Sequence, residues 1–118
     1  LLKTTIVIQY IRSFVKRGRK KDSLVILASQ NVPDFLLPHI IHLTKPLLSI
    51  PKHKFLFNPG ECDENEFKKV LGIRDSEYKL ISSPKRGHCL YCAGNERYHL
   101  KVVAPKYKSE LFGEAGGR

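Results

Sequence analysis

The sequence predicts an α/β fold, with helices and short strands alternating along one chain. Apolar residues recur at helical spacing near the amino terminus, and short apolar runs follow at 24–28 and 55–57. Two strand-like segments flank a glycine turn near residue 94. The expected order is therefore helix, strand, helix or loop, strand, two helices and a hairpin. The length of 118 residues suffices for one domain with its own core.

The first expected element is a helix over about 2–18. Val7, Ile11 and Phe14 recur at helical spacing, with polar residues between them, and Gly18 favours a helix end. The run KRGRKK at 16–21 follows, and cations at this position stabilise the carboxyl end of a helix. We favour that role over a dedicated nucleic-acid patch.

A buried strand is expected at 24–29. Its apolar residues follow one another without a break and stop at a small polar cluster that contains Gln30. The run is too short to span a membrane and suits a strand covered on both faces. In open parallel sheets, polar residues just beyond the carboxyl end of such a strand lie where ligands bind. Gln30 is therefore the first candidate site residue.

The middle of the chain contains several residues that typically form turns or end helices. Pro33 begins a short helix or loop, and further prolines at 38, 46 and 51 are expected to break anything longer. A second short strand at 55–57 stops at the turn sequence Asn58-Pro59-Gly60.

Two short helices and a hairpin are expected next. Asp63 as N-cap, with Glu66 three residues later, opens a helix through 67–71 that stops at Gly72. Asp75 opens another helix, through residue 81, which ends at the sequence SSP. Strands at 88–93 and 97–104 then flank Gly94-Asn95-Glu96. Residues 1–104 form the expected domain, and 105–118 a polar, loosely ordered tail.

The chain is basic, with a net charge of +10 that favours anionic partners without choosing among them. Residues 1–60 carry ten Lys or Arg against two Asp, whereas residues 61–118 carry eleven against nine acids. No secretory signal is recognisable, and three cysteines cannot all pair, so a reducing, cytoplasmic setting is expected. The chain has no methionine and opens within a helical pattern, so we expect it to begin inside a longer protein.

Candidate metal and catalytic motifs are weak. Cys89 and Cys92 beside His88 and His99 suggest zinc, but an odd spacing on a strand points the thiols to opposite faces. We interpret these cysteines as ordinary half-buried thiols. The histidines at 39 and 42 are interpreted as packed or solvated side chains and not as metal ligands. The acids at 61–66 are interpreted as a solvated helix start, so no metal site is predicted. The chain contains neither a G-x-S-x-G motif nor a G-x-x-x-x-G-K-[ST] phosphate loop.

Five segments match, in order, the motifs of one family. Residues 24–35 (LVILASQNVPDF) are similar to V-x-A-T-Q-x-x-x-D-F, with Ser29 where Thr is usual. Residues 55–59 match an apolar strand ending in Asn-Pro, 71–77 an L-G-L-T-D-x-E junction, and 85–91 the R-G-x-x-L-x start of a strand. Residues 111–118 resemble the ending of members from Gram-positive conjugative elements. The chain thus resembles the RecA-like conjugation and type IV secretion ATPases of the VirB-four, CagE and TrsE class.

The resemblance implies the distal part of a RecA-like P-loop domain that ends in a β-hairpin. Its Walker A and Walker B motifs would precede Leu1, which makes the chain the carboxyl-terminal piece of the ATPase, either a truncated product or a gene remnant. The parent would use ATP and Mg to power conjugative DNA transfer or type IV secretion. It would act as a hexameric ring with other secretion components, at the cytoplasmic face of the cell membrane. The piece alone is not expected to hydrolyse ATP.

The resemblance also implies roles for single residues. Gln30 corresponds to the residue that senses the γ-phosphate or orients the attacking water, because a carboxamide donates and accepts at once. Arg86 is the candidate that reaches a neighbour's nucleotide across the ring, with Arg97 as the alternative. Asn58 and Pro59 are expected near the nucleotide.

Two other functions stay open. A small basic nucleic-acid-binding module would use residues 12–21 and the hairpin, and would bind DNA or RNA with a steep salt dependence. An inert remnant or pure interaction piece would bind neither nucleotide nor nucleic acid.

Overall fold

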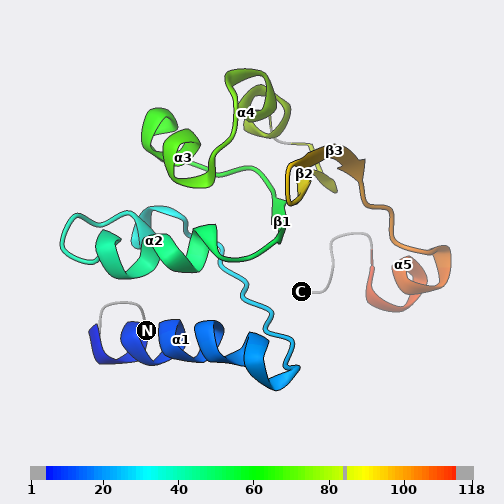
Figure 1. Ribbon diagram of the computed structural model, residues 1–118. Helices are drawn as coiled ribbons and strands as arrows, with labels where there is room; N and C mark the ends of the chain where they lie inside the picture. Colours follow the sequence, from blue (N-terminus) through cyan, green and yellow to red (C-terminus); the bar gives the residue numbers. More distant parts are fainter. Residues whose placement is uncertain (1–4, 84, 114–118) are drawn as a thin grey trace.

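The computed structural model describes residues 5–83 and 85–113 and has a mixed α/β fold (Figure 1). Five helices and three strands, together with two short 3-10 turns, make up this part of the chain. In chain order they are α1 (Thr5–Gly18), η1 (Arg19–Lys21), η2 (Pro33–Phe35), α2 (Ile41–Ser49), β1 (His53–Leu56), α3 (Glu64–Leu71), α4 (Asp75–Ser82), β2 (His88–Ala93), β3 (Glu96–Lys101) and α5 (Lys106–Phe112). The α/β prediction is confirmed.

The three strands form one antiparallel sheet in the order β1-β2-β3. Leu90 in β2 lies opposite Leu56 in β1 and His99 in β3. The predicted hairpin is confirmed, with its turn at Gly94, whose φ of 62° suits glycine. β3 ends at Lys101, earlier than predicted.

The main core lies between one face of the sheet and helices α3 and α4. Phe67 is 1% exposed and packs edge-on against Tyr78, with ring centroids 5.7 Å apart. Leu90 and Cys92 contribute the sheet side of this cluster. Its seven buried members are Phe67, Leu71, Ile73, Tyr78, Ile81, Leu90 and Cys92. Because β2 alternates its side chains, residues 89 and 91 lie on the other face.

Helix ends in this core follow the predicted signals. Asp63 is the N-cap of α3, and its Oδ1 accepts a hydrogen bond from the Glu66 backbone N–H at 2.7 Å. Gly72, with a φ of 66°, ends the helix in the left-handed conformation, as its position predicts. The helix begins at Glu64, directly after the predicted N-cap. α4 also matches its prediction, and the Arg74 N–H donates to Glu77 Oε2 at 2.7 Å.

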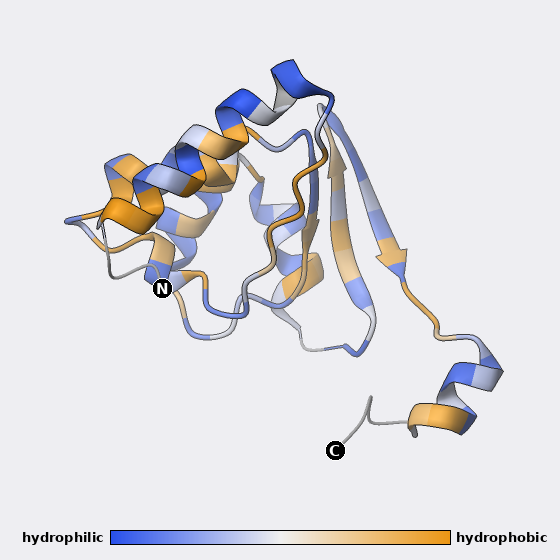
Figure 2. Cartoon of the chain, turned by 90° about the horizontal axis from the view of Figure 1, so that it is seen from below, coloured by the Kyte–Doolittle hydropathy of each residue, from blue (hydrophilic) through white to orange (hydrophobic). Residues whose placement is uncertain are grey.

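A second, smaller core joins α1 to α2. Ile8 and Ile40 are almost fully buried there, and Leu43 and Leu47 complete the cluster. Figure 2 shows the apolar sides of these helices facing each other. The predicted first helix is confirmed from Thr5 onward, and its earlier residues lie outside the described part. The expected break at Pro46 is wrong, since this proline lies within α2 and removes only one helix hydrogen bond.

The predicted strand at 24–29 is wrong. These residues are not part of any strand, and the side chains of Leu24 and Ile26 are 85% and 82% exposed. In Figure 2 the apolar stretch is a coil between the helices and the sheet. A strand requires a hydrogen-bonded neighbour, and among the described residues β1 pairs only with β2. The apolar pattern is therefore present without a partner strand.

The predicted loosely ordered tail contains a helix, α5. Figures 1 and 2 both show it standing apart from the rest of the chain. Tyr107, Leu111 and Phe112 are 59%, 74% and 65% exposed, so its apolar residues have little to pack against. The sequence after Gly113 lies outside the described residues. Within the described chain, every helix is too short or too polar to cross a bilayer.

Candidate functional site

A tight turn before β2 positions the first group of candidate residues. The backbone O of Lys85 accepts a hydrogen bond from the His88 N–H at 3.1 Å, which closes a turn around Arg86 and Gly87. Gly87 has a φ of 77°, as the third residue of a type II turn requires. A Cβ on Gly87 would lie 2.4 Å from the Val102 backbone O, so only glycine fits. The turn therefore holds Lys85, Arg86 and His88 in a fixed arrangement.

The chain that leaves β1 forms the opposite side. Asn58 Oδ1 accepts a hydrogen bond from the Gly60 N–H at 2.8 Å, which makes a local side-chain turn. Asn58 Nδ2 donates to the Ser82 backbone O at 3.0 Å and so ties the end of β1 to the end of α4. Pro59 is buried, whereas Asn58 stays exposed.

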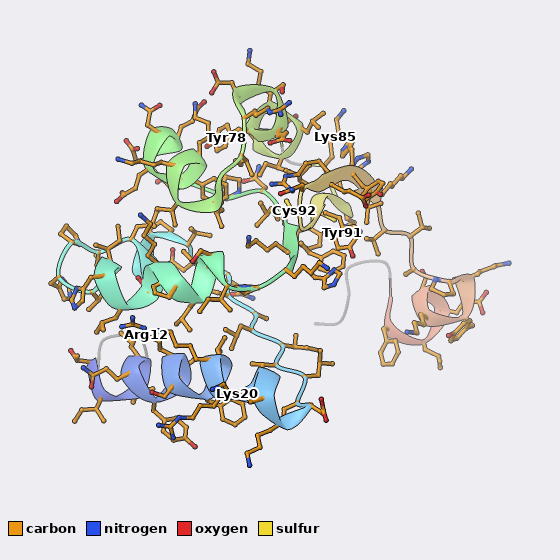
Figure 3. The ribbon with its side chains drawn as sticks, in the orientation of Figure 1. Arg12, Lys20, Tyr78, Lys85, Tyr91 and Cys92 are labelled. Carbon is orange, nitrogen blue, oxygen red and sulfur yellow. The ribbon has the colours of Figure 1, made fainter. Side chains whose placement is uncertain are left out.

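These two segments line one open hollow of about 320 Å³. Its residues are Phe57, Asn58, Lys85, Arg86, Gly87 and His88. Two predicted site residues, Asn58 and Arg86, are thus brought together although 28 positions separate them in the sequence. Lys85 projects from this end of the sheet (Figure 3). The hollow combines an aromatic wall, an amide and several cations.

Two histidines meet beside this hollow. His88 Nδ1 lies 3.2 Å from His99 Nε2, and the ring centroids are 5.2 Å apart. Partial burial lowers the pKa of His88, and the neighbouring His99, Lys101 and Lys85 lower it further. The strand register explains the cluster, because His88 lies opposite Lys101 and His99 is two positions away on the same face.

Arg97 lies at the other end of the hairpin. Its Nη1 donates to the backbone O atoms of Gly94 and Glu96 at 2.7 and 3.0 Å, and its Nε lies 3.8 Å from Glu77 Oε1. These contacts hold the hairpin turn against α4. The two candidate arginines are therefore separated by the length of β2, and Arg86 is the one in the hollow.

Gln30 lies in an exposed loop rather than at the end of a paired strand. Its neighbours form a local turn, in which the Asn31 N–H donates to Ser29 Oγ at 3.2 Å. Gln30 is absent from the lining of the hollow. The structure thus brings Asn58 and Arg86 together but leaves Gln30 apart from them.

The cysteines are packing residues in this structure. Cys89 and Cys92 are 0% and 3% exposed, and burial raises the pKa of both thiols. Burial also raises the pKa of Cys62, against an opposing hydrogen bond from Tyr78. Across residues 5–83 and 85–113, no three His, Cys, Asp or Glu side chains gather as a metal site would require.

The opposite face of the sheet carries a row of aromatic side chains. Tyr91 stacks on Phe55 at 4.6 Å and on Tyr98 at 6.0 Å, so the row crosses all three strands. His53 joins it through a 2.8 Å contact between its Nδ1 and the Tyr91 Oη. Figure 3 shows Tyr91 and Tyr78 on different sides of the sheet. The pairing register of a predicted hairpin is the sequence signal that would have revealed both this row and the histidine pair.

Comparison with solved structures shows which family the chain resembles. Neither family models nor curated protein sequences give a match. Among solved structures, VirB4 of Thermoanaerobacter pseudethanolicus matches 92% of this chain at 34% sequence identity, with a TM-score of 0.81. The chain is of the VirB4 type. This confirms the family resemblance of the five sequence segments. The chain spans 29% of the length of that VirB4, so the activity of a whole VirB4-type protein belongs to the proposals below.

Proposed function

We propose that this VirB4-type chain is the distal part of a RecA-like ATPase domain that powers type IV secretion or conjugative DNA transfer. The observation that carries the proposal is the match to VirB4 over 92% of the chain at 34% identity. In the parent protein, the phosphate loop and the Walker B acid lie outside these 118 residues. ATP and Mg are bound there, and this chain supplies the groups that complete the site.

The unpaired segment at 24–29 supports the RecA-like part of the proposal. Leu24 and Ile26 are exposed in an extended stretch, and β1 has a neighbour on one edge only among the described residues. A parallel sheet needs buried apolar strands of this kind. In the parent, 24–29 becomes a strand of the central sheet, and Gln30 then stands at its carboxyl end, where ligands bind.

Gln30, Asn58 and Arg86 have different tasks in this proposal. Gln30 orients the attacking water or senses the γ-phosphate. Asn58, with Pro59, lies beside the nucleotide, and Arg86 extends from its fixed turn to the nucleotide of the neighbouring subunit in a hexameric ring. We favour Arg86 over Arg97, because Arg86 lines the hollow together with Asn58, whereas Arg97 lies at the other end of the hairpin, beside the Gly94 turn.

The proposed setting follows from the parent's task. The ring associates with other type IV secretion components at the inner face of the cell membrane, as a peripheral protein. DNA is the transferred substrate in conjugative members.

Steady-state ATP hydrolysis by the parent tests these roles. Arg86→Ala should lower kcat by roughly 10³-fold, the scale of an arginine that stabilises phosphoryl transfer across an interface. Arg97→Ala is the matched control and should lower stability more than kcat. Equal losses in both variants would contradict the choice of Arg86.

The isolated chain provides a second test. We expect no ATP turnover from the 118 residues, because the sequence has no phosphate loop. Turnover that persists through repurification, and that Gln30→Ala abolishes, would overturn the assignment of the catalytic machinery to the rest of the parent.

A second candidate function has one observation in its favour. The row of Phe55, Tyr91 and Tyr98 crosses a sheet face of a chain with a net charge of +10, and exposed aromatics beside cations bind single strands by stacking. This candidate predicts oligonucleotide binding that weakens steeply with salt and is lost in Tyr98→Ala. The rings stack on one another, however, so fewer ring faces are open to bases.

A further inference from the structure

We propose that the His88–His99 pair, together with Lys85 and Lys101, forms a binding site for a phosphate group. Lys85 comes from the turn before β2, His88 from the start of β2, and His99 and Lys101 from the facing strand β3. The site does not rest on the proposed ATPase function, because it is argued from the geometry and charge of the hairpin and the turn before it, although it adjoins the hollow that contains Asn58 and Arg86.

The geometry brings two ring nitrogens into contact with each other. His88 Nδ1 and His99 Nε2 lie 3.2 Å apart, so in the neutral pair one ring donates a hydrogen bond to the other. When both rings are protonated, that bond is lost and both nitrogens become donors. The rings then turn apart, and a tetrahedral oxyanion accepts a hydrogen bond from each and offsets the repulsion between them.

The charge around the pair is uncompensated. The groups that act electrostatically on His88 are His99, Lys101 and Lys85, and no carboxylate is among them. Lys85 and Lys101 are exposed, and neither forms an ion pair within the described part of the chain. Positive potential of this kind raises the local concentration of anions.

The backbone holds the cluster in place before any ligand arrives. The Lys85–His88 hydrogen bond closes the turn, and the Val102 N–H donates to the Gly87 backbone O at 2.8 Å. The adjoining hollow of about 320 Å³ leaves room for a small phosphate compound against Phe57. A preorganised set of donors lowers the ordering cost of binding.

The test is an NMR titration of the imidazole resonances of the complete chain, at constant ionic strength. Inorganic sulfate is the first probe, because it stays a dianion over the working pH range and so leaves the histidines as the groups that titrate. We expect saturable shifts of His88 and His99, and a rise in the pKa of both rings at saturating sulfate. Binding should strengthen as the pH falls, since the protonated rings are the donors. His53, which contacts Tyr91 Oη, is the internal control and should not shift.

Variants separate a site from general attraction to a basic protein. Lys101→Gln should weaken sulfate binding by about tenfold, which is the loss of one charge-assisted contact. Lys20→Gln removes an equal charge in η1, the turn after α1, and should leave the affinity unchanged. His99→Gln should weaken the pH dependence of binding, because His88 is then the single ring of the pair that titrates. If His99→Gln does not fold, Lys101→Gln still decides the test.

Two further probes identify the source of the phosphate. Saturation by ATP below the concentration needed for inorganic phosphate would assign the site to a nucleotide, and the reverse order to a free anion. Shifts that rise linearly without saturating, or equal weakening in Lys20→Gln and Lys101→Gln, would overturn the site. Failure of this test leaves the ATPase proposal intact, because that proposal is measured by turnover of the parent.

Discussion

The two regions of the molecule differ in how completely they bury their apolar residues. In the sheet region (residues 53–101), Phe67, Ile81 and Leu90 are 1–2% exposed. In the helical region (residues 5–50), the α1–α2 contact is buried, but Ile6 and Tyr10 on the other side of α1 are 76% and 71% exposed. The sheet region therefore finds its packing partners within the chain, whereas the helical region carries more apolar surface than the chain covers.

A buried polar atom also shows that the helical region is packed less favourably than the sheet region. Arg12, which Figure 3 shows between α1 and α2, has its Nε buried without a hydrogen-bond partner among the described residues. Such an atom destabilises the contact that contains it. We therefore expect stability to depend mainly on the sheet region, and the following substitutions test that expectation.

Phe67→Ala should have the largest effect. The ring is 1% exposed and packs against Tyr78, so its removal should lower the free energy of unfolding by about 3–5 kcal/mol. Urea denaturation measures this loss. Ile26→Ala, at a side chain that is 82% exposed, should change stability by less than about 0.5 kcal/mol. Similar losses in the two variants would remove the distinction between the regions.

Gly87→Ala should have the next largest effect. Its φ of 77° disfavours other residues, and the new Cβ would meet the Val102 backbone O at 2.4 Å. Strain and overlap together should cost about 2–4 kcal/mol. Gly60→Ala is the matched control, since its φ of 66° is similar but nothing lies within 4 Å, so only the conformational cost of about 1–2 kcal/mol applies. Thermal unfolding that gives equal costs would show that Val102 yields and the turn is not rigid.

Asp63→Ala should produce a smaller change. Loss of the cap on Glu66 N–H should destabilise α3 by about 1 kcal/mol. Asp63→Asn keeps a side-chain oxygen as acceptor and should retain most of the stability. If Asp63→Asn loses as much stability as Asp63→Ala, the effect comes from the negative charge at the helix start and not from the hydrogen bond.

The weakest expected effect is the pH dependence of the Lys68–Asp75 contact. A hydrogen bond from Lys68 lowers the pKa of Asp75 below its ordinary value, at an N–O distance of 2.7 Å. The contribution to stability is therefore present above the ordinary aspartate range and is lost as the pH falls through the lowered pKa. Unfolding of Asp75→Asn, compared with the native chain at each pH, should differ near neutrality and converge in acid. A difference that is constant with pH would exclude this linkage.

Local signals in the sequence predicted the sheet region well. Asp63, Gly72 and the Gly94 turn each act within a few residues, so their roles follow from sequence alone. The predicted strand at 24–29 is wrong because a strand needs a neighbouring strand to pair with, and no local sequence pattern reports that neighbour. The helix α5 was missed because polar composition concealed the four-residue spacing of Tyr107 and Leu111.

The site can be predicted from the sequence only in part, because its residues come together only in the folded chain. Asn58 and Arg86 were chosen from motifs, and they share a hollow in the structure. Spacing alone did not separate Arg86 from Arg97, because their difference lies in which end of the hairpin each occupies. The histidine pair depends on strand register, which no single motif in the sequence reports.

Hydrogen exchange of the backbone amides at 24–29 tests the central claim most directly. We expect fast exchange of these amides in the 118-residue chain, where the segment is an unpaired coil, and slow exchange at 89–92 in the centre of the sheet. In a full-length VirB4-type parent, both segments should exchange slowly if 24–29 pairs within the RecA-like sheet that we propose. Fast exchange at 24–29 in the parent would contradict the account.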